Sequence, residues 1–368
     1  MKSLVRLIVI VLTITLTLLI TPNRTTNAVT SDKLAIDLDE AIEAGIRDSI
    51  DIKIINEKIK NAESRLSYAD RIAGIKGNES WITDEERAEN RRDVVLKPVQ
   101  KKNILEVLKL QKAESIDSIK ASITKSFYTY LLIQKQIINQ EAATKRLEKK
   151  YEIVKAQVSL GVESKASLDS IELELMTGAQ KKRLLLRDSD NEKINLNSLL
   201  SRPITQELRL NEKEIPVSDF DIDIEEVINK RIKNSSQILA ALNSKAEAKI
   251  EYDIINYSST KIIPDGVEQA EDKLLDATYN YESLLKEQES SILNEYNDLL
   301  NLRDDIDIKK YQLEISEMDL KKSQVQYDKG VINIVQYNNS CEALDSAKVA
   351  YEKAKLDHFL AISKFIIN

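Results

Sequence analysis

The sequence predicts an all-α protein built from long amphipathic helices, and three features of its composition lead to this fold class. The 368 residues include only 7 Gly and 5 Pro, about a quarter of average usage. Because tight turns rely on these two residues, most of the chain must lie in long uninterrupted elements. Charged residues make up 31% and aromatic residues 5%, which is typical of exposed helices rather than sheets. With the narrow apolar stripes along these helices and the repeated segments described below, the sequence predicts duplicated long helical hairpins in an elongated coiled-coil bundle.

The first 28 residues have the features of a secretory signal peptide. Lys2 and Arg6 give a basic start, an apolar run follows from Leu7 to Ile20, and Thr26-Asn27-Ala28 places small residues at a cleavage point. The apolar run is shorter than the roughly 20 residues of a spanning helix. We therefore predict an exported chain with a signal peptide at 1–28, and an uncleaved anchor is the alternative.

Two equivalent segments open two helical units. Residues 36–42 and 222–228 have the same order of apolar and acidic residues. Asp37 in the first segment and Asp223 in the second are placed to cap free main-chain N–H groups, each with a glutamate three residues later. The sequence thus predicts one unit written twice, at 29–216 and 217–368, with Pro203 and Pro216 marking the joint.

Each unit is predicted to contain a helical hairpin with a glycine at its tip. No Gly or Pro interrupts residues 100–160 or 267–329, and a helix of roughly 60 residues is about 90 Å long. Gly161 and Gly330 end these two runs, and we expect both to adopt the left-handed conformation that lets the chain reverse. The predicted return helices are 162–200 and 332–366.

Two stretches lack a sustained apolar pattern and are predicted to be loops. Residues 73–100 contain Trp81, Pro98 and a run of mixed charge, and residues 257–266 contain Pro264 and a glycine. Neither stretch alternates apolar and polar residues in a way that favours a strand.

Catalytic, metal and nucleic-acid chemistry have no support in the sequence. The chain has one Cys, Cys341, and one His, His358, which excludes a site with two Cys or two His ligands and any disulfide within the chain. No phosphate-binding glycine loop or nucleophile–base signature is found. The formal net charge is −7, which is not the basic footprint of a nucleic-acid-binding protein. We therefore expect no catalytic residues, no metal and no cofactor, and we predict that the protein is not an enzyme.

With these repeated hairpin motifs, the sequence resembles the outer-membrane efflux protein family, the TolC-like channels. The resemblance covers nearly the whole chain after residue 28, and the order and duplication of its motifs carry it more than any single motif. It is carried by Leu38-Asp39-Glu40-Ala41-Ile42, by residues 147–185 with Leu160-Gly161-Val162, by Leu199-Leu200-Ser201-Arg202-Pro203, and by their counterparts in the second half. In the last of the quoted motifs, Ser201 stands where the family usually has glycine.

The resemblance implies three chains assembling into a helical tube, a trimeric α-barrel, in an export or efflux system. It also implies partners, namely a homotrimer together with adaptor or permease subunits of an export pump. The tip positions that match the family's docking positions are Gly161, Val162, Glu163, Gly330, Val331 and Ile332.

Two departures from the family pattern are visible in the sequence. Strands that span a membrane take about 9–11 residues with an apolar alternate pattern, and neither of the two predicted loops provides them, so we expect no β-barrel and only indirect membrane association. Where family members narrow the tube with aspartates after the second tip, this chain has Gln336 and Asn339. These two positions, with Asp169 after the first tip, are the predicted pore-constriction positions.

Two functions remain open from the sequence. The first is a passive conduit or docking element of an export pump in the cell envelope. The second is a coiled-coil structural or interaction protein of the envelope that forms no channel. An adaptor subunit is a weaker third hypothesis, because adaptors combine helical hairpins with β-rich modules that this sequence lacks.

Overall fold

The computed structural model describes residues 35–77, 83–211, 213–216, 222–258 and 264–367. The predicted signal peptide and Trp81 lie outside these residues. Residues 36–368 form one compact unit, which is described here by itself. Its described residues are almost entirely helical, apart from one isolated parallel bridge between Ile36 and Leu210. None of the described helices is both long and apolar enough to cross a membrane.

The helices occur in two series of matching lengths. In the first series, α2 (Leu38–Asp48, 11 residues) and α3 (Ile50–Lys76, 27 residues) lead to α5 (Lys97–Ser159, 63 residues) and α6 (Lys165–Leu199, 35 residues). In the second, α7 (Ile224–Asn234, 11 residues) and α8 (Ser236–Ser258, 23 residues) lead to α9 (Pro264–Asp328, 65 residues) and α10 (Ile334–Ile367, 34 residues). The predicted all-α fold of duplicated long helical hairpins is therefore confirmed.

The helices α2 and α7 begin directly after the two predicted capping aspartates. Asp223 Oδ1 accepts hydrogen bonds from the N–H groups of Glu225 at 2.9 Å and Glu226 at 3.2 Å. Asp37 occupies the N-cap of α2, and its own N–H donates to Glu40 Oε2 at 3.4 Å. These caps satisfy donors that the first turn of a helix leaves without main-chain partners.

Most of the predicted loop at 73–100 is helical, so that prediction was wrong. α3 continues to Lys76, α4 (Asp84–Arg91) follows, and a π-helical turn η1 (Arg92–Leu96) joins α4 to α5. The Pro98 that suggested a loop lies in the first turn of α5, where proline is tolerated because that N–H needs no helical partner.

The predicted loop at 257–266 is also shorter than expected. α8 ends at Ser258 and α9 begins at Pro264. Proline at the start of a helix again explains the difference, because its fixed φ angle suits the first helical position.

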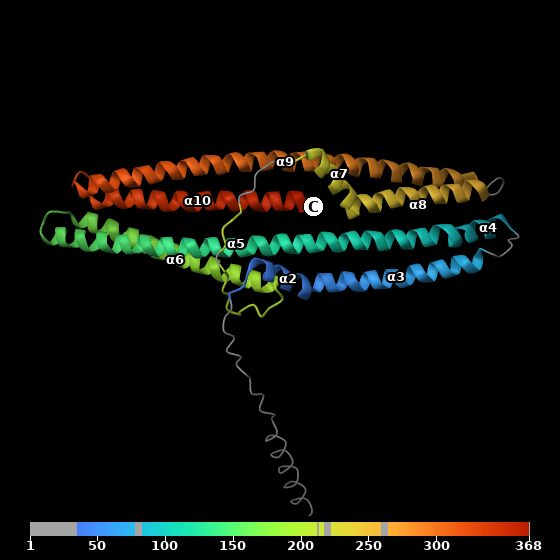
Figure 1. The fold of residues 1–368 in the computed structure, drawn as a ribbon, viewed down its shortest axis with the longest axis horizontal. Coiled ribbons are helices and arrows are strands. Elements are labelled where there is room, and N and C mark those ends of the chain that lie inside the picture. Colours follow the sequence, from blue (N-terminus) through green and yellow to red (C-terminus); the bar gives the residue numbers. More distant parts are fainter. Residues whose placement is uncertain (1–34, 78–82, 212, 217–221, 259–263, 368) are drawn as a thin grey trace, which may run out of the picture. The chain divides into compact units, whose positions relative to one another are not determined.

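The helices pack side by side in four rows. α9 forms one edge and packs on α8 and α10, which lie end to end in the next row (Figure 1). α5 forms the third row and packs on both of these, and α3 and α6 lie end to end along its other side. One edge of this layer is therefore α9, and the other edge is α3 together with α6.

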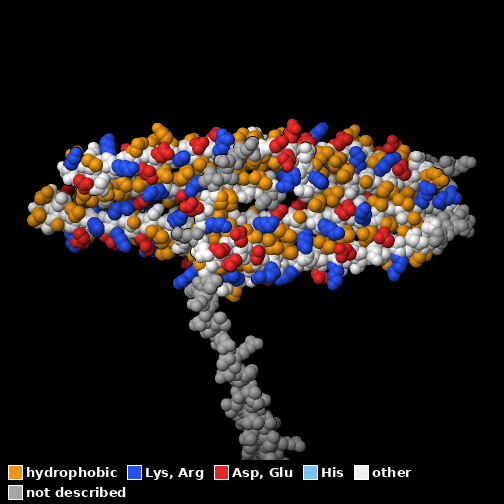
Figure 2. Space-filling model, viewed as in Figure 1, with side chains coloured by type: hydrophobic (Ala, Val, Ile, Leu, Met, Phe, Trp, Pro, Cys, Tyr) orange, Lys and Arg blue, Asp and Glu red, His pale blue; other side chains and the backbone are white. Residues whose placement is uncertain are grey.

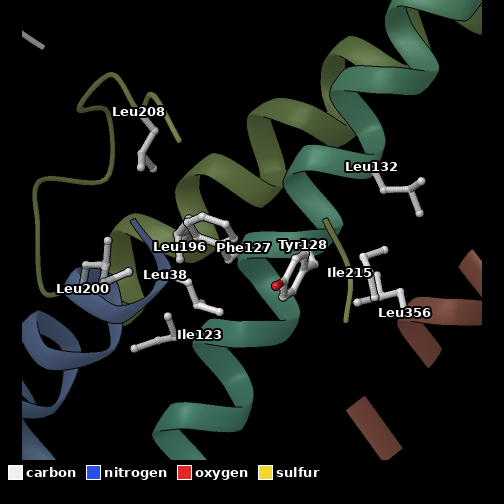
Figure 3. Close-up of a cluster of buried hydrophobic side chains, with 11 residues drawn as sticks. Leu38, Ile123, Phe127, Tyr128, Leu132, Leu196, Leu200, Leu208, Ile215 and Leu356 are labelled. Carbon is white, nitrogen blue, oxygen red and sulfur yellow. The ribbon is translucent and has the colours of Figure 1, made fainter. Parts of the chain in front are cut away.

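A hydrophobic cluster fixes the first unit at the place where α3 and α6 meet. Leu38 and Ala41 of α2 pack there against α5 and the end of α6 (Figure 3). The fully buried members include Ile123, Phe127 and Leu196. The remaining buried members are Tyr128, Leu132, Leu200, Leu208, Ile215 and Leu356.

A second, smaller cluster is built from the equivalent helices of the second series. Ile292 and Leu299 of α9 pack with Ile362 and Phe365 of α10, and α7 covers them with apolar side chains such as Ile224 and Ile228. In each series the short entry helix thus seals the long helix and the end of the return helix. The burial of these apolar side chains contributes most of the stability of such contacts.

Candidate functional site

The tip of the first hairpin is a glycine-terminated helix end. Gly161 has φ = 73°, its N–H donates to the carbonyl of Val158 at 3.0 Å, and the N–H of Val162 donates to the carbonyl of Gln157 at 2.9 Å. These two bonds define a Schellman motif, which closes the last turn of α5 and reverses the chain.

The tip of the second hairpin repeats this geometry. Gly330 has φ = 72°, its N–H donates to Tyr327 O at 2.9 Å, and the N–H of Val331 donates to Gln326 O at 2.8 Å. The predicted left-handed conformation is therefore confirmed at both glycines. A Cβ atom at either position would meet nothing within 4 Å, so glycine is favoured there by φ and not by space.

Both tips expose apolar side chains to solvent. Leu160 is 76% exposed, Val162 72% and Val331 68%. Hydrophobic side chains are visible at the end of the α5–α6 hairpin, on the left of Figure 2. Such side chains at a chain reversal are costly to leave in water and suit the docking of another apolar surface.

The residues after each glycine restart a helix in two different ways. After the first tip, Ser164 Oγ accepts from the N–H of Ser167 at 3.1 Å, and Glu163 Oε2 accepts from Ser167 Oγ at 3.0 Å. After the second, Asn333 Oδ1 accepts from the N–H of Gln336 at 2.9 Å, and Gln336 Oε1 accepts from the N–H of Asn333 at 3.1 Å. The second arrangement is a reciprocal capping box.

Aromatic packing stiffens the second hairpin behind its tip. The rings of Tyr327 and Tyr337 stack with centroids 5.2 Å apart and an interplanar angle of 18°. Burial, and then a hydrogen bond with Cys341, raise the pKa of Tyr337 above its ordinary value. The phenol is therefore neutral at physiological pH, and Cys341 lies in a packed setting rather than an exposed one.

A groove of about 800 Å³ lies further from the tips, between α5, α6 and α10. Arg146 and Asp345 form an ion pair across it with an N–O distance of 2.8 Å. Lys150, whose side chain is 9% exposed, pairs with Glu174 at 2.8 Å. The first of these pairs joins the two hairpins, and the second stays within the first hairpin. Their partners are far apart in sequence, so no local motif identifies them.

The three predicted constriction positions are not brought together in one pocket. Asn339 lines the groove described above, Gln336 takes part in the capping box of α10, and Asp169 is exposed near the start of α6. Within the part of the chain that the structure describes, no group of three or more His, Cys, Asp or Glu side chains is arranged to hold a metal ion.

The fold is that of known outer-membrane channels. No protein-family model and no curated protein sequence matches the chain. Similar solved structures include the CmeC outer membrane channel of Campylobacter jejuni, with a TM-score of 0.68 and 11% identity over 90% of this chain and 84% of that chain. VceC of Vibrio cholerae has a TM-score of 0.61 and 14% identity over 89% of this chain and 95% of that chain. The open-state MtrE outer membrane channel of Neisseria gonorrhoeae has a TM-score of 0.61 and 12% identity over 90% and 88%. The chain therefore has the TolC-like helical fold, as its sequence motifs indicated.

Proposed function

We propose that this chain is a component of an envelope export system, in which three copies close a helical tube and the hairpin tips dock on adaptor or permease subunits. The proposal rests first on the fold, which is shared with solved outer-membrane channels along about 90% of the chain. Identity to these channels is only 11–14%, and exposed apolar surfaces of this chain support a tube independently of it.

The observation that carries the proposal is an apolar seam on the α9 edge. Large apolar side chains recur there every three, four or seven residues and are 38–64% exposed; they are Ile308, Tyr311, Ile315, Met318 and Val325. This is the heptad spacing of a coiled-coil seam, and such a seam is stable only when another helix covers it. These five side chains stay exposed, so no described helix of the same chain covers them.

A second set of exposed apolar side chains lies on the opposite edge. Met176 and Leu184 of α6 are 69% and 47% exposed. Both sets lie in the half of the layer that ends in the two tips (Figure 1). Because the two edges are different surfaces, their association is head to tail, and such association generates a ring when the rotation closes. The family resemblance sets the number of copies at three.

The tips supply the second part of the proposal. Each of the inferred repeats, 29–216 and 217–368, contributes one tip, and both tips present a valine directly after the left-handed glycine. Helical hairpins that expose apolar residues suit docking into a groove of another helical hairpin. We place the protein in the cell envelope, exported by residues 1–28, with membrane contact through its partners. The constriction positions Asp169, Gln336 and Asn339 remain predictions that depend on the ring.

Sedimentation equilibrium of the full-length chain, expressed with its own N-terminus, tests the ring. The wild type is expected to be a trimer, and the seam variant I315D/M318D a monomer with unchanged helical circular dichroism. The matched control I138D/I153D places the same changes on exposed positions of α5 and should remain trimeric. A wild type that is monomeric at all concentrations would favour the structural, non-channel function instead.

A further inference from the structure

The half of the layer far from the tips has a groove between α3 and α5 (Figure 1). It consists of two adjoining hollows of about 260 Å³ and 650 Å³. Arg65 of α3 and Lys101 of α5 line both hollows, so these two cations lie where the hollows meet. Lys58 also lines the smaller hollow, and no Asp or Glu is among the described residues around it.

The larger hollow is basic as well. Its one described carboxylate, Asp93, contacts both Lys76 and Lys97. Hydrogen bonds from these two lysines hold the pKa of Asp93 below its ordinary value, so the carboxylate is ionised and its charge is already compensated. The three cations of the smaller hollow, by contrast, form no ion pair with another described residue. The groove therefore has positive charge that the described residues do not balance.

The second unit provides an internal comparison for this groove. α7 and α8 begin 186 positions after α2 and α3 (at 224 and 236 against 38 and 50), and the tip glycines at 161 and 330 are 169 positions apart. With these offsets, each of the three cations has an uncharged or acidic residue at its equivalent position. The equivalents of Lys58, Arg65 and Lys101 are Ser244, Glu251 and Ala270.

The charges at the equivalent positions of α8 are balanced within the chain. Glu247 and Glu251 line a hollow beside α9. Arg92 Nη2 lies 2.7 Å from Glu251 Oε1, and Asn103 Nδ2 donates to Glu247 Oε1 at 2.8 Å. α8 and α9 pack on each other without the three cations. A role in helix packing therefore does not account for the cations of the first unit.

Much of the remaining lining of the groove is apolar. Ala62 and Ala69 of α3 are only 6% and 8% exposed, and their short side chains leave space that larger ones would fill. Ile104 and Leu108 line the smaller hollow, and Tyr68 lines the larger one. Because Ile104 is 48% and Tyr68 57% exposed, an apolar group that covered them would gain from leaving water.

We propose that this groove binds an anion that carries an apolar chain, the chemistry shared by alkyl phosphates and anionic lipids. The anionic group lies between Arg65 and Lys101, and the chain lies along Ile104 in the smaller hollow. The guanidinium offers a fork of N–H groups that matches two oxygens of a phosphate, and the ammonium adds a point charge. The site lies within one chain, so it does not depend on the ring proposed above.

Charge and apolar contact are both needed for useful affinity. Salt screens exposed charges over about 10 Å at 0.1 M, so a small inorganic anion is expected to bind weakly. Each methylene group that the groove buries adds about fourfold to the affinity. Affinity for alkyl phosphates should therefore rise with the length of the chain.

Isothermal titration calorimetry of the full-length chain, with decyl phosphate below its critical micelle concentration, tests the site. The wild type is expected to bind decyl phosphate at least tenfold more tightly than inorganic phosphate. The variant K58S/R65Q/K101A should weaken the binding of decyl phosphate about tenfold or more. Because serine and alanine are the residues that the second unit has at two of these positions, the variant is expected to keep its helical circular dichroism.

Two further variants separate the parts of the site. The control R187Q/K233S/K348A removes the same charge at exposed positions outside the groove and should bind decyl phosphate like the wild type. The variant I104N leaves the charges in place. It should weaken the binding of decyl phosphate severalfold and leave the binding of inorganic phosphate unchanged.

Flotation with vesicles identifies the source of the anion. Vesicles of phosphatidylcholine alone are compared with vesicles that also contain phosphatidylglycerol. Binding to the second kind only, lost in K58S/R65Q/K101A, would support the site and assign it to a membrane lipid. Binding of decyl phosphate without binding to either kind of vesicle would support the site and assign it to a soluble amphiphile.

Three results would overturn the proposal. The first is a wild type that binds neither decyl phosphate nor the vesicles. The second is equal binding by the wild type and K58S/R65Q/K101A, which would leave the cations as an ordinary solvated surface. The third is inorganic polyphosphate binding as tightly as decyl phosphate, with I104N affecting neither, because the groove would then recognise charge alone.

Discussion

Arg146 Nη2 lies 2.8 Å from Asp345 Oδ2 and joins the first hairpin to the second across 199 positions of sequence. Both side chains are partly exposed. The pair connects α5 with α10 across the groove. The ion pair therefore stabilises the packing of one hairpin on the other more than it stabilises either hairpin by itself.

A double-mutant cycle at Arg146 and Asp345 should give a coupling energy of about 1 kcal/mol in chemical unfolding. The reason is that the pair is half-shielded and well aligned, so it is worth more than a surface pair. The matched control is Lys182 and Glu141, which pair at 2.9 Å within the first hairpin but are more exposed. A coupling at Arg146–Asp345 no larger than that of the control would contradict this role.

Alanine at either tip glycine should destabilise the protein. Substitution G161A or G330A forces an L-residue into the left-handed region at a cost of about 1–2 kcal/mol, although neither position is crowded. Gly74, inside α3 and also uncrowded, provides the control, because G74A should stabilise by up to about 1 kcal/mol. Urea denaturation measures all three variants. If all three shifted stability in the same direction, the backbone explanation would fail.

Glycine at position 201 should stabilise the end of α6. Ser201 has φ = 52°, its N–H donates to Ser198 O at 3.0 Å, and Arg202 N–H donates to Asn197 O at 2.9 Å. Ser201 thus occupies the left-handed position of a Schellman motif, where glycine is favoured. We expect S201G to add roughly 0.5–1 kcal/mol, and S201A to lower stability because it keeps the strain and loses the bond from Ser201 Oγ to Asp48 O at 3.3 Å. Thermal unfolding of the two variants distinguishes relief of strain from loss of the side chain.

Stability should fall on acidification below about pH 6.5, the ordinary pKa of histidine. His358 is 3% exposed, and burial, followed by the charge of Arg303, lowers its pKa in the folded state. Between that lowered pKa and the ordinary value, the unfolded chain binds more protons, so the free energy of unfolding rises with pH. The variant H358Q should flatten this dependence at pH values below about 6.5, measured by urea denaturation. If the free energy of unfolding depended on pH equally in the wild type and in H358Q, groups other than His358 would cause the loss of stability.

The sequence was informative where a backbone requirement selects a residue type. Gly161, Gly330, Asp37 and Asp223 each do what their residue type and position predicted, because a left-handed turn and a helix start have few chemical solutions. The long helices begin and end within a few residues of the predicted bounds for the same reason. Ser201 adopts the left-handed conformation although it is not a glycine. The place of a residue at the end of a helix therefore predicts this conformation, and not only the residue type.

The prediction for residues 73–100 failed because charge and proline were treated as evidence for a loop. Thr83 and Glu86 form a capping box in the structure, with bonds of 3.2 Å and 3.0 Å, and the T-x-x-E pattern for it was present. The Asn333–Gln336 box was not predicted either, although its N-x-x-Q pattern was also present. Contacts such as Arg146–Asp345 could not be predicted, since nothing local marks a partner 199 positions away.

Electron microscopy of the full-length chain, purified after export, tests the central claim most directly. End views should show a closed ring with threefold symmetry, in which α9 of each copy lies against α3 and α6 of the next. Views of single layers, or of dimers related by a twofold axis with α9 against α9, would contradict the account.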